Sequence, residues 1–250
     1  MRKLFILSGA GLSAESGIPV FRGSGGVWEE HDIMQVCSIQ YWRQNRDLVT
    51  RFYDERRIEL KDKIPNRAHY AIARLQKRFK GRIWNMTQNV DDLLERAGCE
   101  DVIHLHGTLR DLRCESCGNC WDIGYRAQNE GDSCPACGSF SVRHNVVMFG
   151  EPAPAYRFIK RAMDESALFV AIGTSGEVLD IVMIASEFDR SILIDPNRKM
   201  YVTSFGSHDR YIDEYFEIFL QKKAGEAAEE LEELVAAFFQ AEDETSPSSR

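Results

Sequence analysis

The chain has 250 residues, of which 44% are hydrophobic, enough for one large α/β domain that carries a small insert. Its formal net charge of −8 argues against a dedicated nucleic-acid-binding protein, which would carry a basic stripe. No apolar run reaches the ~20 residues that a membrane-spanning helix needs. The short apolar stretch at 4–7 runs at once into a glycine turn, so we interpret it as a strand and not as a signal peptide, and expect a cytoplasmic protein without membrane association.

Short apolar runs alternate with helical patterns along most of the chain. We expect strands at 3–8, 83–87, 102–106, 168–172 and 192–194, and helices from about Leu12 to Pro19 and over 40–62, 66–79, 91–98, 178–188 and 208–240. Asn66 is a candidate N-cap, and Gly81 a candidate stop, for the helix at 66–79. The alternation predicts right-handed βαβ units, and therefore an α/β fold with a Rossmann-like parallel sheet.

Two segments interrupt this alternation and are expected to form a small inserted module. One is helical, 39–63, and the other, 114–143, carries paired cysteines. The Rossmann-like core is then expected to comprise 1–38, 64–113 and 144–222. Residues 223–250 are expected to form an acidic helix followed by a disordered tail, which is polar from residue 242 onward.

Seven cysteines are present, and five of them lie within 114–137. Cys114 and Cys117 form one Cys-x-x-Cys pair and Cys134 and Cys137 another, with sixteen residues between the pairs, a spacing typical of a zinc ribbon. Cys120 also fits a pair with Cys117, but the choice of Cys114 makes both units Cys-x-x-Cys-Gly. Because four thiolates leave no open coordination position, the sequence predicts one structural zinc ion.

A glycine-rich turn follows the first expected strand. Residues 9–14 (GAGLSA) fit the pattern G-x-G-x-x-A, in which glycines let the backbone approach a pyrophosphate at a helix N-terminus. The acidic residue that binds the ribose in dehydrogenases would have to be Glu29 or Glu30, and no convincing strand precedes either. The turn therefore indicates a dinucleotide bound in a different pose from that of a hydride-transfer enzyme.

Several further motifs resemble those of one family, the sirtuins. Residues 9–23 (GAGLSAESGIPVFRG) resemble the first sirtuin motif, 87–91 (TQNVD) the second, and His106-Gly107 the third. The two cysteine pairs follow in the family's order, and 173–175 (GTS) resembles its later nucleotide-contact turn. The resemblance runs from about residue 4 to 195 and implies an NAD-dependent protein-lysine deacylase of the bacterial or archaeal type.

The resemblance implies that NAD is a consumed co-substrate. In the implied reaction the acyl-lysine carbonyl oxygen attacks C1′ of the ribose and nicotinamide leaves. Asn89 and His106 would be the catalytic residues, with His106 as the general base, because a neutral imidazole can take a ribose hydroxyl proton near neutral pH. The products are lysine and O-acyl-ADP-ribose. The expected NAD-binding residues are Gly9, Ala10, Gly11, Ser13, Phe21, Arg22, Gln88, Asn89, Asp91, Gly173, Thr174, Ser175 and Asp195.

Tyr53 and Arg56 lie three residues apart, on one face of an expected helix. The pair resembles the Tyr-x-x-Arg signature of class III sirtuins, which favour succinyl, malonyl and glutaryl lysine. A guanidinium can clamp an acyl carboxylate while a phenol adds a hydrogen bond. The alternative is an ordinary exposed helix face. With acyl-lysine proteins or peptides as partners, the expected substrate-binding residues are Tyr53, Arg56, Val147, Phe149 and Gly150.

Three positions depart from the family's pattern. Met148 stands where relatives often have Trp, Asp180 where Pro is more usual, and Asp195 where many relatives have Asn. These departures bear on cofactor affinity and peptide preference and leave the implied reaction class unchanged.

Three other functions stay open on the sequence. The same site could serve an NAD-dependent ADP-ribosyltransferase or an NAD hydrolase. The cysteine module could be a zinc ribbon that binds protein or nucleic acid, although acidic residues interleave with its arginines and no aromatic-basic stripe emerges. The third alternative is a hydride-transferring dehydrogenase.

Overall fold

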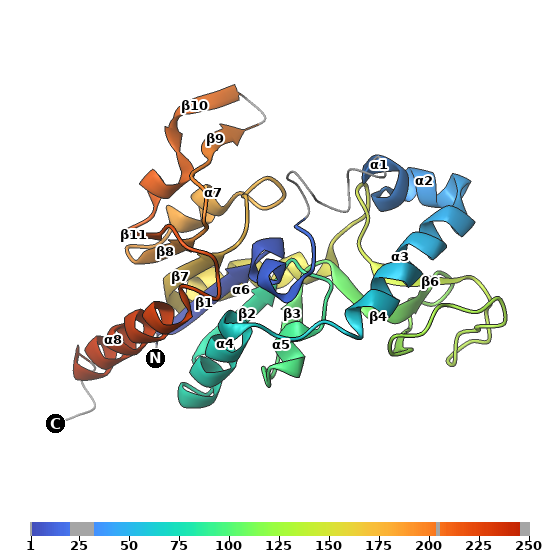
Figure 1. The fold of residues 1–250 in the computed structure, drawn as a ribbon, viewed down its shortest axis with the longest axis horizontal. Helices are drawn as coiled ribbons and strands as arrows, with labels where there is room; N and C mark the ends of the chain where they lie inside the picture. Colours follow the sequence, from blue (N-terminus) through green and yellow to red (C-terminus); the bar gives the residue numbers. More distant parts are fainter. Residues whose placement is uncertain (1, 21–32, 204–205, 246–250) are drawn as a thin grey trace.

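The computed structural model describes residues 2–20, 33–203 and 206–245. Within these ranges the chain forms a six-stranded sheet, a three-stranded sheet and a two-stranded antiparallel sheet. Figure 1 shows the six-stranded sheet and its helices in one part of the molecule, with the three-stranded sheet and the helices of residues 33–60 beside it. The described residues include no helix that is both long and apolar enough to cross a membrane.

The six-stranded sheet is parallel throughout and forms the core of the larger part. Its strands are β1 (Lys3–Ser8), β2 (Ile83–Thr87), β3 (Ile103–His104), β7 (Ser166–Ile172), β8 (Ser191–Ile194) and β11 (Ile218–Leu220). They lie in the order β11-β8-β7-β1-β2-β3. Along the chain, β2 and β3 are added on one side of β1, and β7, β8 and β11 are then added on its other side. The order therefore reverses between β1 and β7, the place where open parallel sheets bind ligands. The predicted Rossmann-like α/β fold is confirmed.

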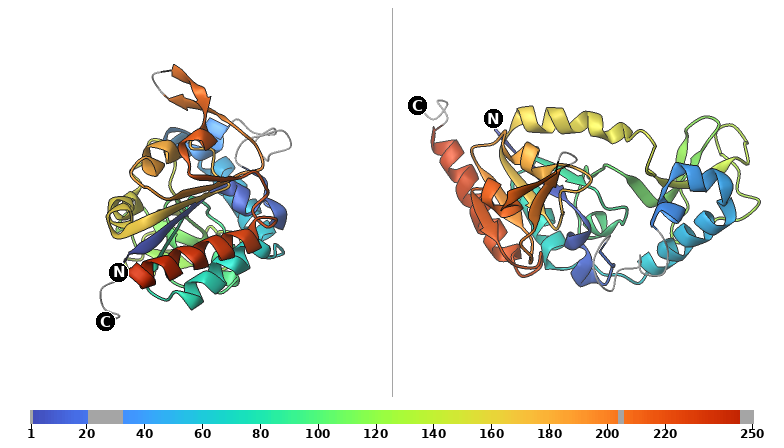
Figure 2. Two further views of the ribbon diagram at one scale, coloured as in Figure 1. Left: turned by 90° about the vertical axis from the view of Figure 1, so that its left-hand side faces the viewer. Right: turned by 90° about the horizontal axis from the view of Figure 1, so that it is seen from above.

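Helices cover both faces of this sheet, so its strands are apolar on both sides. These helices are α4 (Arg67–Arg78), α5 (Leu93–Arg96), α6 (Arg157–Glu165), α7 (Ile181–Ala185) and α8 (Ala228–Thr245). Leu4 and Ile6 of β1 belong to the apolar cluster under α4 and α8, which lie side by side (Figure 2), whereas Phe5 and Leu7 belong to the cluster under α6 and α7. Asn66 caps α4 as predicted, because its side chain accepts a hydrogen bond from the amide of Ala68 at 3.0 Å.

The small module joins three helices to an antiparallel sheet. The helices are α1 (Ile33–Cys37), α2 (Ile39–Gln44) and α3 (Arg46–Leu60), and the strands, in the order β5-β4-β6, are β4 (Gly107–Cys114), β5 (Cys120–Asp122) and β6 (Val142–Val146). Because β4 pairs with β6 from Gly107 onward, the sheet spans 107–146 and extends beyond the 114–143 range on both sides. Val36, Trp42 and Val146 share one buried core, which unites the helical and the cysteine-bearing segments.

The helix expected from about Leu12 is wrong, since the segment forms two 3₁₀ turns, η1 (Ala10–Leu12) and η2 (Ala14–Ser16). The physical reason is Asn66, whose Nδ2 donates to the carbonyl oxygen of Leu12 at 2.7 Å and to Oγ of Ser16 at 3.1 Å. An α-helix would give the Leu12 carbonyl to the amide of Ser16, but that amide donates to Ser13 at 3.0 Å. The chain after β1 therefore stays in tight turns.

The helix expected over 208–240 is wrong in its first part. Residues 206–220 form β10 (Gly206–Tyr211), the turn η5 (Ile212–Tyr215) and β11, and α8 begins only at Ala228. β10 pairs with β9 (Met200–Thr203), and β11 joins the edge of the large sheet beside β8. Pairing with an open sheet edge thus overrides the helical spacing of this segment. The tail expected to be disordered from 242 is helical to 245, and 246–250 lie outside the described residues.

Candidate active site

The residues predicted to bind NAD gather at the carboxyl edge of the parallel sheet, as far as the structure describes them. Ser8 ends β1, Thr87 ends β2 and Ile172 ends β7. The predicted residues follow these ends and that of β8, with His106 two residues beyond β3. They are Gly9, Ala10, Gly11 and Ser13 after β1, Gln88, Asn89 and Asp91 after β2, Gly173, Thr174 and Ser175 after β7, and Asp195 after β8. Phe21 and Arg22 lie outside the described residues.

The glycine turns after β1 and β7 lie directly against one another. The amide of Gly9 donates to the carbonyl of Ile172, and that of Gly11 to the carbonyl of Gly173, both at 2.9 Å. A Cβ atom on Gly11 would stand 2.6 Å from the Cα of Gly173, which has a positive φ of 59°. These glycines therefore permit the close approach of two backbone turns at the point where the strand order reverses.

A buried serine organises the polar side chains beside these turns. Ser13 is fully buried, and its hydroxyl donates to Oδ2 of Asp91 at 2.9 Å and accepts from Nδ2 of Asn89 at 3.1 Å. The other oxygen of Asp91 accepts from the amide of Leu93 at 3.1 Å. Burial raises the pKa of Asp91, while the Leu93 amide and the Ser13 hydroxyl act against that rise. The hydroxyl thus brings two predicted NAD-binding side chains together.

His69 also contacts Ser13 and was missing from the residues predicted by sequence. Its Nδ1 accepts from the amide of Asn66 at 3.2 Å, so Nε2 carries the hydrogen and donates to Oγ of Ser13 at 3.3 Å. Burial lowers the pKa of His69 to about 4, which keeps the imidazole neutral. A signal was available: Asn66-x-x-His69 at a helix start is a capping box, and the histidine is its reciprocal partner.

His106 is held in one tautomer by Gln88, the residue that follows β2. Its Nδ1 lies 2.9 Å from the carbonyl oxygen of Gln88, which can only accept, so Nδ1 carries the hydrogen. Its Nε2 therefore holds the free electron pair and accepts from the hydroxyl of Tyr156 at 2.8 Å. Burial lowers the pKa of His106, and the Gln88 carbonyl acts in the opposite direction. The Gln88 side chain donates to Oγ1 of Thr174 at 2.9 Å, which ties the β2 and β7 ends together.

His104 differs from His106 because each of its two ring nitrogens faces an oxygen that accepts hydrogen bonds. Nδ1 lies 3.0 Å from the carbonyl oxygen of Asn89, and Nε2 lies 2.7 Å from a carboxylate oxygen of Glu95. Both nitrogens can then carry hydrogens, as in the charged ring. This arrangement suits a structural histidine and leaves His106 as the candidate base.

Two of the three departures from the family's pattern have local structural roles. Asp180 is the N-cap of α7, where it accepts from the amides of Val182 and Met183, and its second oxygen accepts from the hydroxyl of Tyr201 at 2.7 Å. Asp195 is buried after β8 and pairs with Lys199 at 3.0 Å. Asp195 and Thr174 line the same small cavity.

The residues predicted to bind the acyl-lysine substrate border both His106 and the small module. The amide of Val147 donates to the carbonyl of His106 at 2.9 Å. The amide of Phe149 donates to the carbonyl of Cys37 at 2.8 Å, and Gly150, which is exposed, follows with a φ of 86°. The segment at 147–150 therefore runs from the candidate base toward the start of α2.

Tyr53 and Arg56 lie one turn apart on α3, with different surroundings. The hydroxyl of Tyr53, a buried residue, donates to Sγ of Cys37 at 3.3 Å. Arg56 is half-buried, and its guanidinium lies 4.3 Å from the ring centroid of Phe52 and 3.2 Å from a carboxylate oxygen of Glu55. Both side chains therefore have protein partners in this structure.

The four predicted zinc ligands converge as the spacing requires. The sulfur atoms of Cys114, Cys117, Cys134 and Cys137 all lie within 4.8 Å of one another. The sulfurs of Cys114 and Cys137 are 3.6 Å apart, as are those of Cys117 and Cys134, against about 3.8 Å expected for a tetrahedron with Zn–S bonds of about 2.3 Å. The donor set therefore fits one zinc ion with no open position. Cys120 is exposed, and its sulfur contacts the carbonyl of Gly118 instead.

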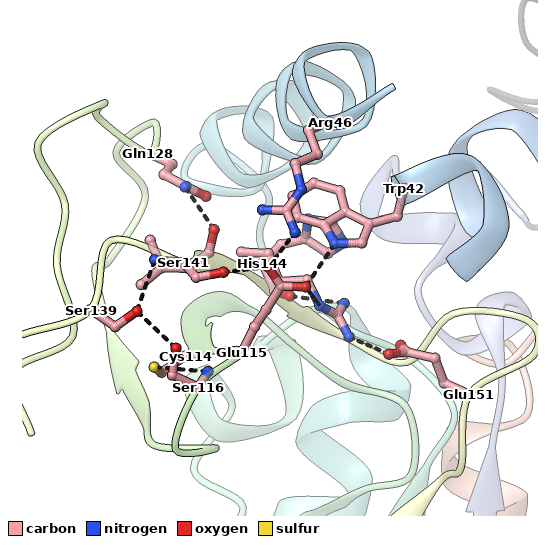
Figure 3. A network of polar contacts seen from close by, with 12 residues as sticks. Trp42, Arg46, Cys114, Glu115, Ser116, Gln128, Ser139, Ser141, His144 and Glu151 are labelled. Carbon is pink, nitrogen blue, oxygen red and sulfur yellow. Dashed lines mark hydrogen bonds and ion pairs between the residues drawn. The ribbon is translucent and has the colours of Figure 1, made fainter. Parts of the chain in front are cut away.

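A polar network connects this cysteine site to the rest of the small module (Figure 3). The carboxylate of Glu115 accepts from Nε1 of Trp42 at 3.0 Å and from Arg46 at 2.7 Å. It also lies 4.0 Å from Arg143, a fully buried arginine that donates to Glu151 at 2.5 Å. The second oxygen of Glu151 accepts from the amide of Met148 at 3.0 Å. The network thus reaches from the residue after Cys114 to the segment at 147–150.

Comparisons with known proteins agree with this arrangement. The model of the Sir2 family matches residues 9–180. An NAD-dependent protein deacylase of Campylobacter jejuni (strain RM1221) is 49% identical over 193 residues, which cover 77% of this chain and 82% of the relative. A solved complex of a Sir2 homologue with NAD has a TM-score of 0.78 at 33% identity and covers 94% of this chain and 90% of that one. A solved Sir2 homologue mutant with ADP-ribose has a TM-score of 0.80 at 33% identity, with 96% and 94% covered. The chain belongs to the Sir2 family.

Proposed function

We propose that this protein is an NAD-dependent deacylase that removes acyl groups from protein lysines and releases nicotinamide and O-acyl-ADP-ribose. The observation that carries the proposal is the tautomer of His106. Its Nδ1 donates its hydrogen to the carbonyl of Gln88, so Nε2 keeps its electron pair. A base in that state, at the carboxyl edge of a parallel sheet, can take a proton from a sugar hydroxyl. The names of the Campylobacter relative and of the solved NAD complex support this function.

The polar cluster around Ser13 would hold the nicotinamide end of NAD. Asn89 and Asp91, positioned by the Ser13 hydroxyl, supply a donor and an acceptor close to the turns after β1 and β7. Gln88, whose side chain donates to Thr174, would add a carboxamide. Bound NAD supplies the ribose carbon that receives the acyl oxygen. Within this site the residues at 9–11 and 173–175 would border the phosphates, Asp195 the adenosine end, and Phe21 and Arg22 the reacting ribose.

The metal has no part in the reaction under this proposal. Four cysteine sulfurs complete the coordination of zinc, so no position is left for substrate or water. The ion would instead fix the two turns of the small module that support Glu115 and β4. Cysteines that bind zinc must stay reduced, which is typical of a reducing compartment, and we propose a cytoplasmic protein on that ground.

We further propose that acidic acyl groups, succinyl and malonyl, are substrates along with acetyl. Arg56 is the cationic residue of the Tyr-x-x-Arg signature, which would bring it beside the acyl chain. It is half-buried on α3 near Cys37. A carboxylate that replaced Glu55 as its partner could accept two parallel hydrogen bonds from the guanidinium. The Tyr53 hydroxyl would then bind that carboxylate only after leaving Cys37.

Product analysis tests the proposal directly. Acetyl-, succinyl- and unmodified lysine peptides are incubated with NAD and the full chain, and the products are identified by mass spectrometry. We expect equal amounts of free-lysine peptide and O-acyl-ADP-ribose, and neither product with the His106→Ala variant. Free ADP-ribose without loss of the acyl group would indicate an NAD hydrolase, and a peptide that gains ADP-ribose would indicate a transferase.

A further inference from the structure

Tyr156 touches the candidate base and belongs to none of the motifs that define the site. It ends η4 (Pro154–Tyr156), the short turn before α6, and it is half-buried against the apolar cluster under that helix. Its hydroxyl lies 2.8 Å from Nε2 of His106, and the two rings are tilted by 44° with centroids 5.8 Å apart. The contact is therefore an end-on hydrogen bond to the ring nitrogen and not a stacking contact.

The direction of this hydrogen bond follows from the other side of the imidazole. Because Nδ1 gives its hydrogen to the carbonyl of Gln88, Nε2 can only accept, so the hydroxyl of Tyr156 is the donor in the free protein. A tyrosine hydroxyl can also accept, by rotation about its C–O bond. Tyr156 can thus be a partner of Nε2 before the ribose hydroxyl binds, as a donor, and again once His106 carries the proton, as an acceptor.

We propose that Tyr156 is a positioning residue for the general base: its hydroxyl holds Nε2 of His106 in place and then accepts from the Nε2 hydrogen once the base is charged. The inference rests on the proposed deacylase function. In the proton-transfer step the O–H bond of the ribose hydroxyl breaks and the N–H bond at Nε2 forms. The electron pair stays on the ribose oxygen, which bonds to the acyl carbon, and the O–H bond of Tyr156 stays intact.

The hydrogen bond that Tyr156 donates to neutral His106 is weaker than the one it accepts from charged His106. This difference gives Tyr156 an effect on the rate of deacylation. A hydrogen bond from a charged imidazole to oxygen is roughly twice as strong as one between neutral partners. Tyr156 would therefore stabilise the charged form of His106, which exists after proton transfer, more than the neutral form that precedes it. Because Nε2 has a single electron pair, the tyrosine hydroxyl leaves it as the ribose hydroxyl arrives and returns as an acceptor after the proton has been transferred.

The position of Tyr156 in the chain links this contact to the substrate. The residue follows Gly150 by six positions, and Val147 of the same segment donates its amide to the backbone carbonyl of His106 at 2.9 Å. Residues 147–156 therefore hold the base by its backbone and by its side chain. A peptide bound along 147–150 would lie on the segment that positions the catalytic nitrogen.

The test uses the Tyr156→Phe variant of the full chain, which keeps the ring and removes only the hydroxyl. The matched control is Tyr201→Phe, which removes a hydroxyl that donates to Asp180 at 2.7 Å. The first measurement is the ¹⁵N spectrum of the histidine side chains without substrate, with the His106 signals assigned from a His106→Gln variant. We expect the Nε2 signal of His106 to move toward that of an imidazole nitrogen with no hydrogen-bond donor in Tyr156→Phe and to stay in Tyr201→Phe.

The second measurement separates the loss of nicotinamide, which precedes the action of the base, from the later transfer of the acyl group, in which the base acts. Exchange of labelled nicotinamide into NAD with an acetyl-lysine peptide reports the first, and release of deacetylated peptide reports the second. In Tyr156→Phe we expect kcat for deacetylation to fall about tenfold, the loss typical of a hydrogen bond to a charged group. Nicotinamide exchange and both KM values should stay within about twofold of the wild-type values.

Three outcomes would overturn the inference: an Nε2 signal that does not move, an unchanged kcat for deacetylation, or an equal fall in exchange and deacetylation. The last of these would mean that Tyr156 only shapes the binding site. Wild-type protein that exchanges no nicotinamide with any acyl-lysine peptide would instead overturn the proposed function. The spectrum would still decide, in that case, whether Tyr156 holds His106.

Discussion

The hydroxyl of Tyr53 donates a hydrogen bond to the sulfur of Cys37 across 3.3 Å, inside the buried core of the small module. The carbonyl of the same cysteine accepts from the amide of Phe149 at 2.8 Å. Cys37 therefore joins the proposed acyl-binding helix α3 to the proposed peptide-binding segment. Burial raises the pKa of its thiol to about 11, so Cys37 stays protonated and serves as a neutral partner for the phenol.

Arg56→Met is expected to lower desuccinylation at least about tenfold, because the guanidinium contributes charge-assisted hydrogen bonds to the acyl carboxylate. Deacetylation should stay within about twofold of wild type, since the acetyl group offers no carboxylate. Steady-state kcat/KM with matched succinyl- and acetyl-lysine peptides measures the difference. Arg51→Met on the same helix, an exposed position, is the control and should change neither activity. An equal loss of both activities in Arg56→Met would contradict the clamp.

The pH dependence of the reaction should report the environment of His106. A general base works in its neutral form, and burial lowers the pKa of His106 below the usual 6.5. As pH falls, kcat should therefore stay level through neutrality and decline only below about pH 6.5. Measurement of kcat from about pH 5 to about pH 9 locates this decline, and His106→Ala should abolish activity throughout. A midpoint near or above neutrality would be inconsistent with a buried, neutral base.

Removal of the metal should unfold the small module. Cys137→Ser is expected to lower the bound zinc from about one ion per chain and to lower the melting temperature, since one of four ligands is lost. Cys120→Ser, three residues beyond Cys117 and with its sulfur outside the cluster, should keep both unchanged. Metal analysis and thermal unfolding in parallel distinguish the two variants. Equal loss of zinc in both would mean that Cys120 is a ligand.

The buried pair of Arg143 and Glu151 should contribute far more to stability than an exposed pair. Their side chains are 2% and 11% exposed, so Glu151→Ala leaves the buried guanidinium without its hydrogen-bonded carboxylate and should cost about 3–5 kcal/mol of unfolding free energy. The control is Asp164→Ala, which removes an ion pair with Lys160 whose side chains are 79% and 56% exposed, and should cost less than about 1 kcal/mol. Urea unfolding of the zinc-loaded protein gives both values, and similar costs would refute the assignment.

Local signals in the sequence were sufficient for the elements that depend on local interactions. Apolar runs marked the strands at 3–8 and 83–87, and the Asn66 cap marked the start of α4. The spacing of Cys114, Cys117, Cys134 and Cys137 selected the ligand set because two tight turns can present four sulfurs with little help from the rest of the chain.

Contacts between distant segments decided the features that the sequence did not predict. The turns after β1 depend on a side chain from residue 66, and β11 depends on an open edge beside β8. The tautomer of His106 depends on the carbonyl of Gln88, the residue after β2, and its partner Tyr156 lies fifty residues further along the chain. No local pattern marks Tyr156, because a single tyrosine after a proline turn has no periodicity or spacing that points to His106.

The most direct test of the central claim is nicotinamide release, measured side by side with acetyl-, succinyl-, malonyl- and unmodified lysine peptides at one NAD concentration. We predict that nicotinamide release depends on the acyl group, with one nicotinamide formed for each lysine that is deacylated. The unmodified peptide should give no release above background. Release at the same rate with and without an acyl-lysine peptide, or no release with any of the acyl peptides, would contradict the assignment of this protein as a deacylase.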